Sequence, residues 1–277
     1  MKHETLIIYR TDRKFDTSSL NQLKIGGKIG FLREILLVNS DFLEDEKGSW
    51  ILNFFKGKPY EQHIYVSRDE PDFKVFKKLT TASFICNNEF GDVDAEKLSI
   101  SIRGSKSIKK CDFIEYPSHY AHIDGRGLSF FSKIENQKDN FYRQVILLSL
   151  AYAYLGAIEY ISNNLSQKVN CANCDIDELN KLYIEAAKFN SIFLFHQPVL
   201  IDKASLTETW KEIDRVFEID VSSKELLEQL SNVHYILNLD SENKRVTQEK
   251  EKQSKQEKWN LCFAIIGIAL AVIELFT

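Results

Sequence analysis

The sequence predicts an α+β protein: an N-terminal mixed α/β domain, then a helical section with a long stalk helix running into one C-terminal transmembrane helix. Short apolar runs separated by turn residues fill positions 1–135, which indicates strands. Helical periodicity dominates from position 139 onwards. The stretch 259–276, WNLCFAIIGIALAVIELF, has no charge between Asn260 and Glu274 and no proline. These observations divide the chain into four predicted segments: 1–135, 139–221, 222–258 and 259–276.

The composition is that of a globular protein. Of the 277 residues, 44% are hydrophobic and 27% are charged, which excludes disorder as a description of the whole chain. The length suggests about two domains. The formal net charge of -4 argues against broad nucleic-acid binding, because neutralising phosphates requires a basic face.

The cysteines predict a reducing compartment. Their number is odd and their spacings form no disulfide framework: Cys86, Cys111, Cys171, Cys174 and Cys262. The N-terminal residues contain no long apolar region of the kind that marks a secretory signal. The body of the protein is therefore expected in the cytoplasm.

Within the first domain, apolar runs and turn residues place the elements in order. A helix is predicted at 72–79, because Pro71 suits the first turn. The alternation of apolar and polar residues at 98–102 predicts a half-buried strand. Residues 31–38 fit either a strand or a helix. The other strands are predicted at 6–9, 49–55, 63–66, 80–86, 113–116 and 128–131.

The helical section begins with a helix at 139–168 that is apolar almost all round. Such a helix lies in a protein core or in a membrane, and its apolar part is short of the roughly 20 residues that a span requires. A buried core helix is therefore favoured over a membrane span. Further helices are predicted at 176–195, where apolar residues recur every three or four positions, and at 205–217.

The stalk helix is predicted to begin at Ser222 and Ser223, which are good N-cap residues. The apolar residues Leu226, Leu230, Val233 and Leu237 follow at coiled-coil spacing and predict an oligomerisation seam. Residues 241–258 are charged and strongly helix-forming. A disordered linker is the alternative for them. A continuous helix over 223–276 would be on the order of 80 Å long.

The apolar stretch at 259–276 is predicted to cross the membrane. Trp259 stands where an interfacial aromatic residue is expected, and four lysines lie shortly before it. The positive-inside rule then keeps the body cytoplasmic and makes the protein a single-pass protein of the inner membrane. A buried C-terminal core helix is the alternative.

Small and charged residues inside this stretch bear on assembly. Gly267 and Ala271 allow transmembrane helices to approach closely. Glu274 lies near the far end and could reach the interface or line a pore. One helix cannot enclose a channel, so any permeation requires a homo-oligomer.

The arrangement of residues 139–276 resembles the layout of the CorA-type divalent-cation channels, with a helical section, a long charged stalk and a C-terminal membrane helix. The family signature Gly-Met-Asn is absent, since the only methionine is Met1, and so is the second membrane helix. The selectivity filter is therefore not carried over. The resemblance implies an oligomeric, funnel-shaped body on a membrane stalk, similar to membrane effectors of bacterial antiviral systems.

Two groups of residues have the chemistry of metal ligands. His119, His122 and Asp124 stand close together, but no glutamate accompanies them as in the zinc-protease motif, and a polar turn is the alternative. On a strand, His122 and Asp124 would share one face and His119 would lie on the other. Cys171 and Cys174 form a single CxxC pair, which is half of a structural zinc site.

A small basic group is the candidate for binding a ligand. Lys106, Lys109 and Lys110, with Arg126 between two glycines, could meet a nucleotide or an anionic lipid, although a solvated surface is the usual role of such a group. The sequence points to no particular cofactor.

Three functional hypotheses follow. The first is a non-enzymatic membrane effector whose N-terminal domain senses a small nucleotide ligand or a protein partner, and whose tail acts on the inner membrane, as in bacterial antiviral defence or ion transport. The second is a membrane-tethered enzyme with His119, His122 and Arg126 in its site. The third is a scaffold that recruits a partner. The lack of a recognisable catalytic motif favours the first.

Overall fold

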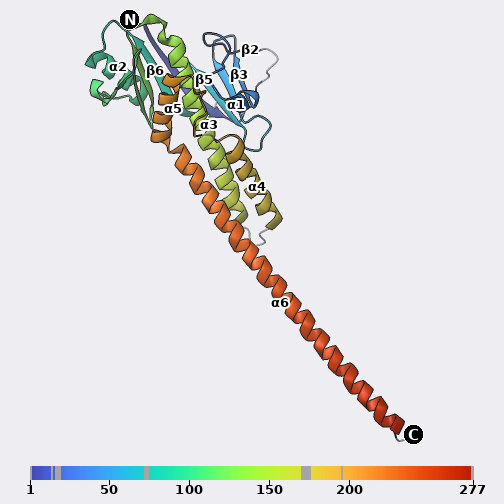
Figure 1. Cartoon of the computed structure of the whole chain (residues 1–277). Coiled ribbons are helices and arrows are strands. Elements are labelled where there is room, and N and C mark those ends of the chain that lie inside the picture. Colours follow the sequence, from blue (N-terminus) through green and yellow to red (C-terminus); the bar gives the residue numbers. More distant parts are fainter. Residues whose placement is uncertain are drawn as a thin grey trace.

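The structure is a computed structural model that describes residues 2–13, 15, 20–71, 75–169, 176–194 and 196–275; at 176, 237, 240, 241, 262 and 265–275 it describes the backbone alone. The fold is mixed α/β, with a nine-stranded sheet and helices on both of its faces. Figure 1 shows the sheet domain at one end of the molecule and one long helix, α6, that leaves it and ends far from the body.

The sheet has the strand order β2-β3-β4-β5-β1-β6-β9-β8-β7. Strands β6 and β9 pair in parallel, and every other described pair is antiparallel. The strands are β1 (Lys2–Thr11), β2 (Asn21–Gln22), β3 (Ser40–Glu44), β4 (Trp50–Phe54), β5 (Gln62–Ser67), β6 (Phe76–Cys86), β7 (Ile114–Glu115), β8 (Tyr120–Asp124) and β9 (Gly127–Ser132).

Two α-helices lie between strands in the first half of the chain, and the other four follow β9. They are α1 (Glu34–Val38), α2 (Asp92–Arg103), α3 (Lys138–Val169), α4 (Ile176–Ile192), α5 (Ala204–Phe217) and α6 (Ile219–Leu275), with short 3-10 helices at Lys110–Asp112 and Glu135–Gln137. The strands expected near 49–55, 63–66, 80–86 and 128–131 are confirmed as β4, β5, β6 and β9, and the helix expected at 139–168 is confirmed as α3.

The strand predicted at 98–102 is wrong, because these residues belong to α2. Leu98 is buried, but Ile100 is 47% exposed, so the apolar alternation does not mark one buried face. Ser99 is fully buried instead, and its hydroxyl donates to the carbonyl of Ser105. The helix starts after Gly91 and ends at Gly104, whose φ of 70° suits glycine.

The helix predicted at 72–79 is wrong as far as the structure describes it. Residues 76–79 belong to β6, where Phe76 pairs with Thr11 and Lys78 pairs with Tyr9. Residues 72–74 lie outside the described part of the chain. The pairing with the ten-residue strand β1 outweighs the local helix signal, because tertiary context commonly overrides propensity.

Helix α3 is the centre of the core. It packs on β4, β5, β6 and β9 with one side and on α4, α5 and α6 with the other. Among the described residues, the helical stretch at 135–169 is the one that is long and apolar enough to cross a membrane, and 72% of its apolar window is buried inside the protein. This burial agrees with the interpretation of a core helix.

Helix α6 has 57 residues, which corresponds to about 85 Å. It begins at Ile219, three residues before the predicted N-cap. Ser223 does not cap it: this side chain is 3% exposed and its hydroxyl lies 2.8 Å from the Asn190 side-chain oxygen on α4. The start of α6 is therefore part of the body, packed against α3 and α4.

The predicted oligomerisation seam is largely internal to the chain. Leu226 and Leu230 are 4% and 2% exposed and belong to the main core, and Val233 packs against it. The side chain of Leu237 lies outside the described part. The spacing predicted a contact with a second copy, but Leu226 and Leu230 pack into this chain's own core.

Candidate ligand-binding site

His119, the first predicted metal ligand, is a core residue. It lies just before β8, is 2% exposed, and stacks between the rings of Tyr116 and Phe130, whose centroids are 4.6 and 4.4 Å away. The side-chain nitrogen of Gln144 is 2.9 Å from its Nε2. Burial lowers the pKa of His119 to about 4, so this ring is neutral at pH 7.

His122 and Asp124 lie on the opposite face of β8, as the strand alternation predicts. Nε2 of His122 is 3.1 Å from Asp124, and Nδ1 is 2.9 Å from the carbonyl oxygen of Asp112. Burial lowers the pKa of His122, but the hydrogen bonds with Asp124 and with the carbonyl of Asp112, together with the negative charge of Asp124, raise the pKa overall. Arg103 also pairs with Asp124.

The predicted metal site and the predicted catalytic group are therefore wrong as groups, since the sheet separates His119 from His122 and Asp124. Among the described side chains, no three His, Cys, Asp or Glu residues are grouped to hold a metal ion. Cys171 and Cys174 lie outside the described residues.

The residues of the predicted basic group have different neighbours. Lys106 pairs with Glu96 on α2 at 2.8 Å, and Lys110 lies over the ring of Phe90. The backbone N–H of Lys109 donates to Asp112, while Arg126 stands in the turn between β8 and β9.

A different candidate site comes from the uneven cover of the sheet. Helix α3 covers one face, and on the other face α2 packs on β6 and β9. Within the described chain, no helix contacts the remaining half of that second face, over β4, β5 and β1, to a comparable extent. A hollow of about 640 Å³ lies there. We call it the sheet-face hollow; its lining residues include Arg13, Phe15, Asp45, Lys47, Ile51, Tyr65, Arg68 and Phe76.

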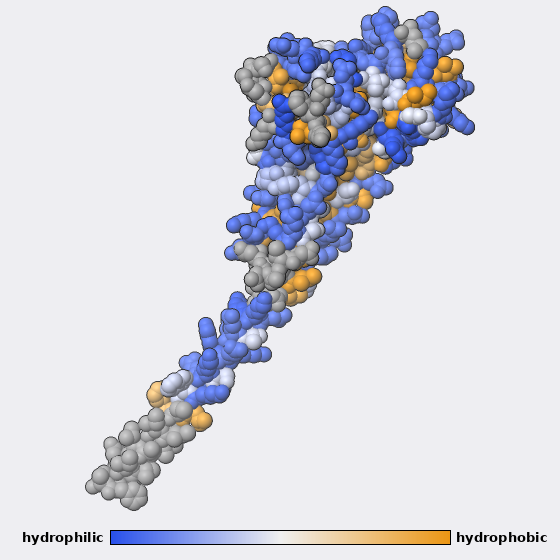
Figure 2. Space-filling model, turned by 180° about the vertical axis from the view of Figure 1, so that it is seen from behind, coloured by the Kyte–Doolittle hydropathy of each residue, from blue (hydrophilic) through white to orange (hydrophobic). Residues whose placement is uncertain are grey.

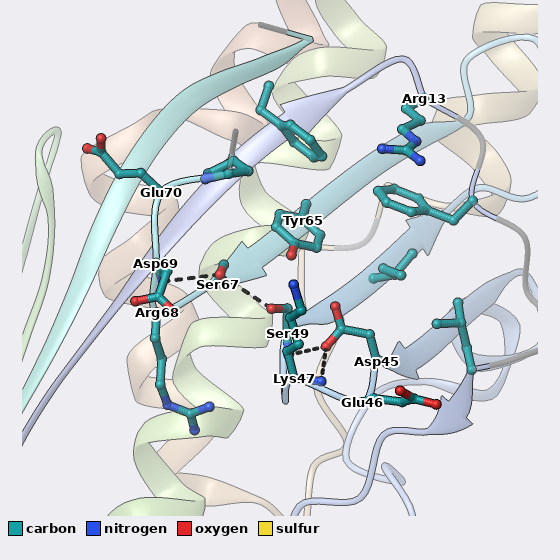
Figure 3. A pocket seen from close by; sticks show the side chains of 15 residues that line it. Arg13, Asp45, Glu46, Lys47, Ser49, Tyr65, Ser67, Arg68, Asp69 and Glu70 are labelled. Atoms are coloured by element: carbon teal, nitrogen blue, oxygen red, sulfur yellow. Dashed lines mark hydrogen bonds between the residues drawn. The ribbon is translucent and has the colours of Figure 1, made fainter. Parts of the chain in front are cut away.

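The wall of the sheet-face hollow is aromatic. Phe15 and Tyr65 stack with centroids 5.8 Å apart and an interplanar angle of 14°, and Phe76 lies 4.9 Å from Tyr65. The guanidinium of Arg13 is 5.6 Å from the centroid of Phe15. Figure 3 shows Tyr65 near the middle of the hollow and Arg13 at one side of it. A planar aromatic ring of a ligand can bind to this wall by stacking its face on the aromatic side chains.

Behind the wall, Tyr9 is 5% exposed, and its hydroxyl has no hydrogen-bond partner among the residues that the structure describes. Its ring lies 6.5 Å from Tyr65 and 6.1 Å from Phe76. Burial and the nearby Glu70 raise the pKa of this hydroxyl, so it stays protonated and can donate. An unpaired buried hydroxyl is unusual and costs stability.

The opposite side of the hollow is the turn between β3 and β4. Asp45 accepts hydrogen bonds from the backbone N–H groups of Lys47 and Ser49, at 2.9 and 2.8 Å. The hydroxyl of Ser49 donates to that of Ser67 at 3.3 Å. These contacts fix the turn against β5, and Figure 3 shows Asp45 and Lys47 below Tyr65.

Arg68 connects the rim of the hollow to α3. Its guanidinium is 2.8 Å from Glu4 and 3.2 Å from the hydroxyl of Tyr142, which also donates to Glu4. Lys138 is 2.9 Å from the same carboxylate. Burial raises the pKa of Glu4, but the hydrogen bonds from Lys138, Tyr142 and Arg68 lower it overall, so it is ionised at pH 7. These contacts link the rim of the hollow to the start of α3.

Sequence reasoning missed this hollow because its residues come from four separate segments. The signal was present in β5, where Ile64 and Val66 face the core while Tyr65 alternates with them. Comparisons with protein-family models, with curated proteins and with solved structures found no match for this chain.

Proposed function

We propose that this protein is a non-enzymatic membrane effector whose body binds a small ligand in the sheet-face hollow and whose helix α6 transmits that event to a bilayer. One observation carries the proposal. The first turns of α6 are buried in the core of the body, through Leu226 and Leu230, while the same helix continues far beyond the body. A rigid helix with one end in the core can couple the two regions.

The residues on the surface of α6 support the proposal that its far end enters a membrane. Figure 2 shows a hydrophilic stalk with apolar residues just before its end. Trp259, Leu261 and Phe263 are 65%, 63% and 63% exposed. Exposed apolar residues gathered on one segment mark an interaction site, and the lysines of 250–258 suit anionic headgroups. The apolar sequence 259–276 then crosses the inner membrane, with the body in the cytoplasm.

The path from hollow to helix supports coupling. Arg68 at the rim is tied to Tyr142 on α3 through Glu4. Helix α3 in turn packs against α6. A ligand that shifts the rim changes the start of α3, and because the core is close-packed the change is passed to α6.

Assembly is required if the tail conducts, because one helix cannot enclose a pore. With Leu226 and Leu230 used inside the chain, the surface for a homo-oligomer lies further along α6. Its exposed apolar residues there are Tyr235, Ile236, Leu239 and Val246. In the bilayer, Gly267 and Ala271 permit close helix packing and Glu274 faces the far interface or a pore. This arrangement is CorA-like in outline and fits an effector of antiviral defence.

The hollow favours a ligand with a planar ring and one anionic group, such as a mononucleotide. The ring would stack on Tyr65 and Phe15, and the anion would lie near Arg13 and Lys47. The rim also carries the exposed carboxylates of Glu46, Asp69 and Glu70. These repel a triphosphate, so a ligand with a single phosphate is favoured.

The test compares the full chain with a version that lacks residues 259–277. The full chain should float with anionic vesicles and release a trapped dye, and the truncated protein should do neither. A second version, with 259–276 replaced by an unrelated leucine-alanine span, separates anchoring from action: it should float without releasing dye. Full cellular activity of the truncated protein would overturn the proposal.

A further inference from the structure

The N-terminal half of β1 has an open edge. Strand β6 pairs with β1 along its whole length, from Lys2 to Thr11. Strand β5 pairs on the other side with Ile7 to Arg10 only. In the part of the chain that the structure describes, residues 2–6 therefore have a strand on one side and none on the other.

A groove of about 630 Å³ runs beside this edge. Its lining comes from β1, from Phe84 on β6, from Arg68 after β5, and from the 3-10 helix before α3 and the first residue of α3: Lys2, His3, Glu4, Thr5, Arg68, Phe84, Glu135 and Lys138. Arg68, which directly follows β5, is held by Glu4 and by the carbonyl oxygen of Gly48. The next residues, Asp69 to Pro71, line the sheet-face hollow, so the described chain after β5 does not continue along this edge.

The open edge presents main-chain groups at the spacing of a strand. Alternate residues of an antiparallel strand point their N–H and C=O groups to the same side, so five residues present roughly five such groups. Proteins usually guard such edges with proline, a bulge or a charge that points across them. Here β1 has no proline, and its bulge lies further on, at Ile8 and Tyr9.

The charged residues beside the edge are already engaged with one another. Lys2 pairs with Glu135, and Glu4 is held by Arg68 and Lys138. The groove thus carries three cationic side chains and two carboxylates, which leaves one positive charge. Two cations, Arg68 and Lys138, share the single carboxylate of Glu4. An additional anion is therefore favoured beside them.

We propose that the open edge of β1 binds an extended acidic peptide of a partner protein, which adds to the sheet as a tenth strand next to residues 2–6. Main-chain hydrogen bonds hold the peptide, and an acidic side chain beside Lys138 selects it. Figure 1 shows the N-terminus at the end of the body far from the tip of α6, so the edge is open to a partner in solution when that tip is in a membrane. The inference does not depend on the ligand of the sheet-face hollow.

The experiment uses the full chain in detergent micelles and two probes, acetyl-Thr-Val-Glu-Val-Thr-amide and the same peptide with Lys in place of Glu. Hydrogen exchange of residues 2–6 is followed by mass spectrometry. In the free protein the outward amides should exchange quickly, and the Glu peptide should protect them at least tenfold. A copy of the Glu peptide with N-methylated backbone should give no protection, because it keeps the side chains and loses the donors.

The variant Lys138→Glu should weaken binding of the Glu peptide about tenfold and strengthen binding of the Lys peptide. The control Lys133→Glu changes an exposed lysine outside the groove and should alter neither. The proposal is overturned if neither peptide protects residues 2–6, or if the N-methylated copy binds equally well. It is also overturned if residues 2–6 are protected without peptide, either at all concentrations or only at high concentration, where a second copy would occupy the edge.

Discussion

The two faces of the sheet are built for different purposes. The face under α3 carries the main core, with Phe54 on β4 and Phe130 on β9 both fully buried. On the second face, Phe131 and Leu98 belong to a separate small core beneath α2. Beyond α2 it carries the sheet-face hollow. The same strands therefore supply stability on one side and a binding surface on the other.

The largest effect should come from truncating a ring on the α3 face. Phe130→Ala removes contacts with Phe84, Phe141 and His119 and should lower the free energy of unfolding by about 3–5 kcal/mol. Tyr65→Ala, the matched change in the hollow, should cost about 1 kcal/mol because Tyr65 is half-buried. Chemical denaturation measures both, and equal losses would contradict the distinction between the faces.

His119 should make the α3 face sensitive to acid. Its folded pKa of about 4 lies below the unfolded value near 6.5, so the unfolded chain binds the proton more readily. Stability should fall as pH drops from 6.5 towards 4, by up to about 3 kcal/mol. His119→Phe keeps a ring between Tyr116 and Phe130 and should remove this part of the pH dependence, measured by denaturation at pH 4.5 and 7. An unchanged pH slope in the variant would show that His119 is accessible to protons.

His122, on the other face of the same strand, should act with the opposite sign and a smaller effect. Burial lowers the pKa of His122, but its hydrogen bonds with Asp124 and Asp112 and the charge of Asp124 together raise this pKa in the folded protein. Its contribution is present below pH 6.5 and is lost as pH rises through the folded pKa. His122→Asn should therefore destabilise the protein more at pH 5.5 than at pH 8. A greater loss at pH 8 would reverse the assignment.

The smallest effects on stability should accompany the largest effects on binding. Lys47→Ala removes an exposed side chain and should change stability by less than about 0.5 kcal/mol. With adenosine 5′-monophosphate as the probe, the same variant should weaken binding about tenfold, because one cation near the phosphate is lost. Lys56→Ala is the control, since Lys56 pairs with Asp41 outside the hollow. Isothermal titration that gives equal affinities for the two variants would remove Lys47 from the site.

Long sequence patterns predicted their elements correctly, and some short ones did not. Long patterns were sufficient for α3, because an almost continuous apolar run of this length has few alternatives to a buried helix. Short patterns were not. The alternation at 98–102 predicted a strand, although these residues form part of α2. The structure shows why the polar residue Ser99 is buried there: its hydroxyl bonds to the backbone of Ser105 and Ser107 in the following loop.

The candidate site was least predictable. The motif-like residues His119, His122 and Asp124 stand together in the sequence, yet the pleat of β8 places them on opposite faces. The residues that form the hollow are distant in sequence: Phe15, Tyr65 and Phe76 meet only because β5 and β6 both pair with β1. A single sequence contains no signal for such pairings.

The sequence by itself determined the periodic elements: the alternation of β5, the apolar run of α3 and the regular helical spacing of Leu226 and Leu230. Tertiary structure alone decided what each apolar or polar face meets. It turned the leucine seam inward, stacked His119 between two rings, and left one half of a sheet face open. The physical reason is that periodicity fixes which residues share a face, while burial and charge depend on the partner that packs against that face.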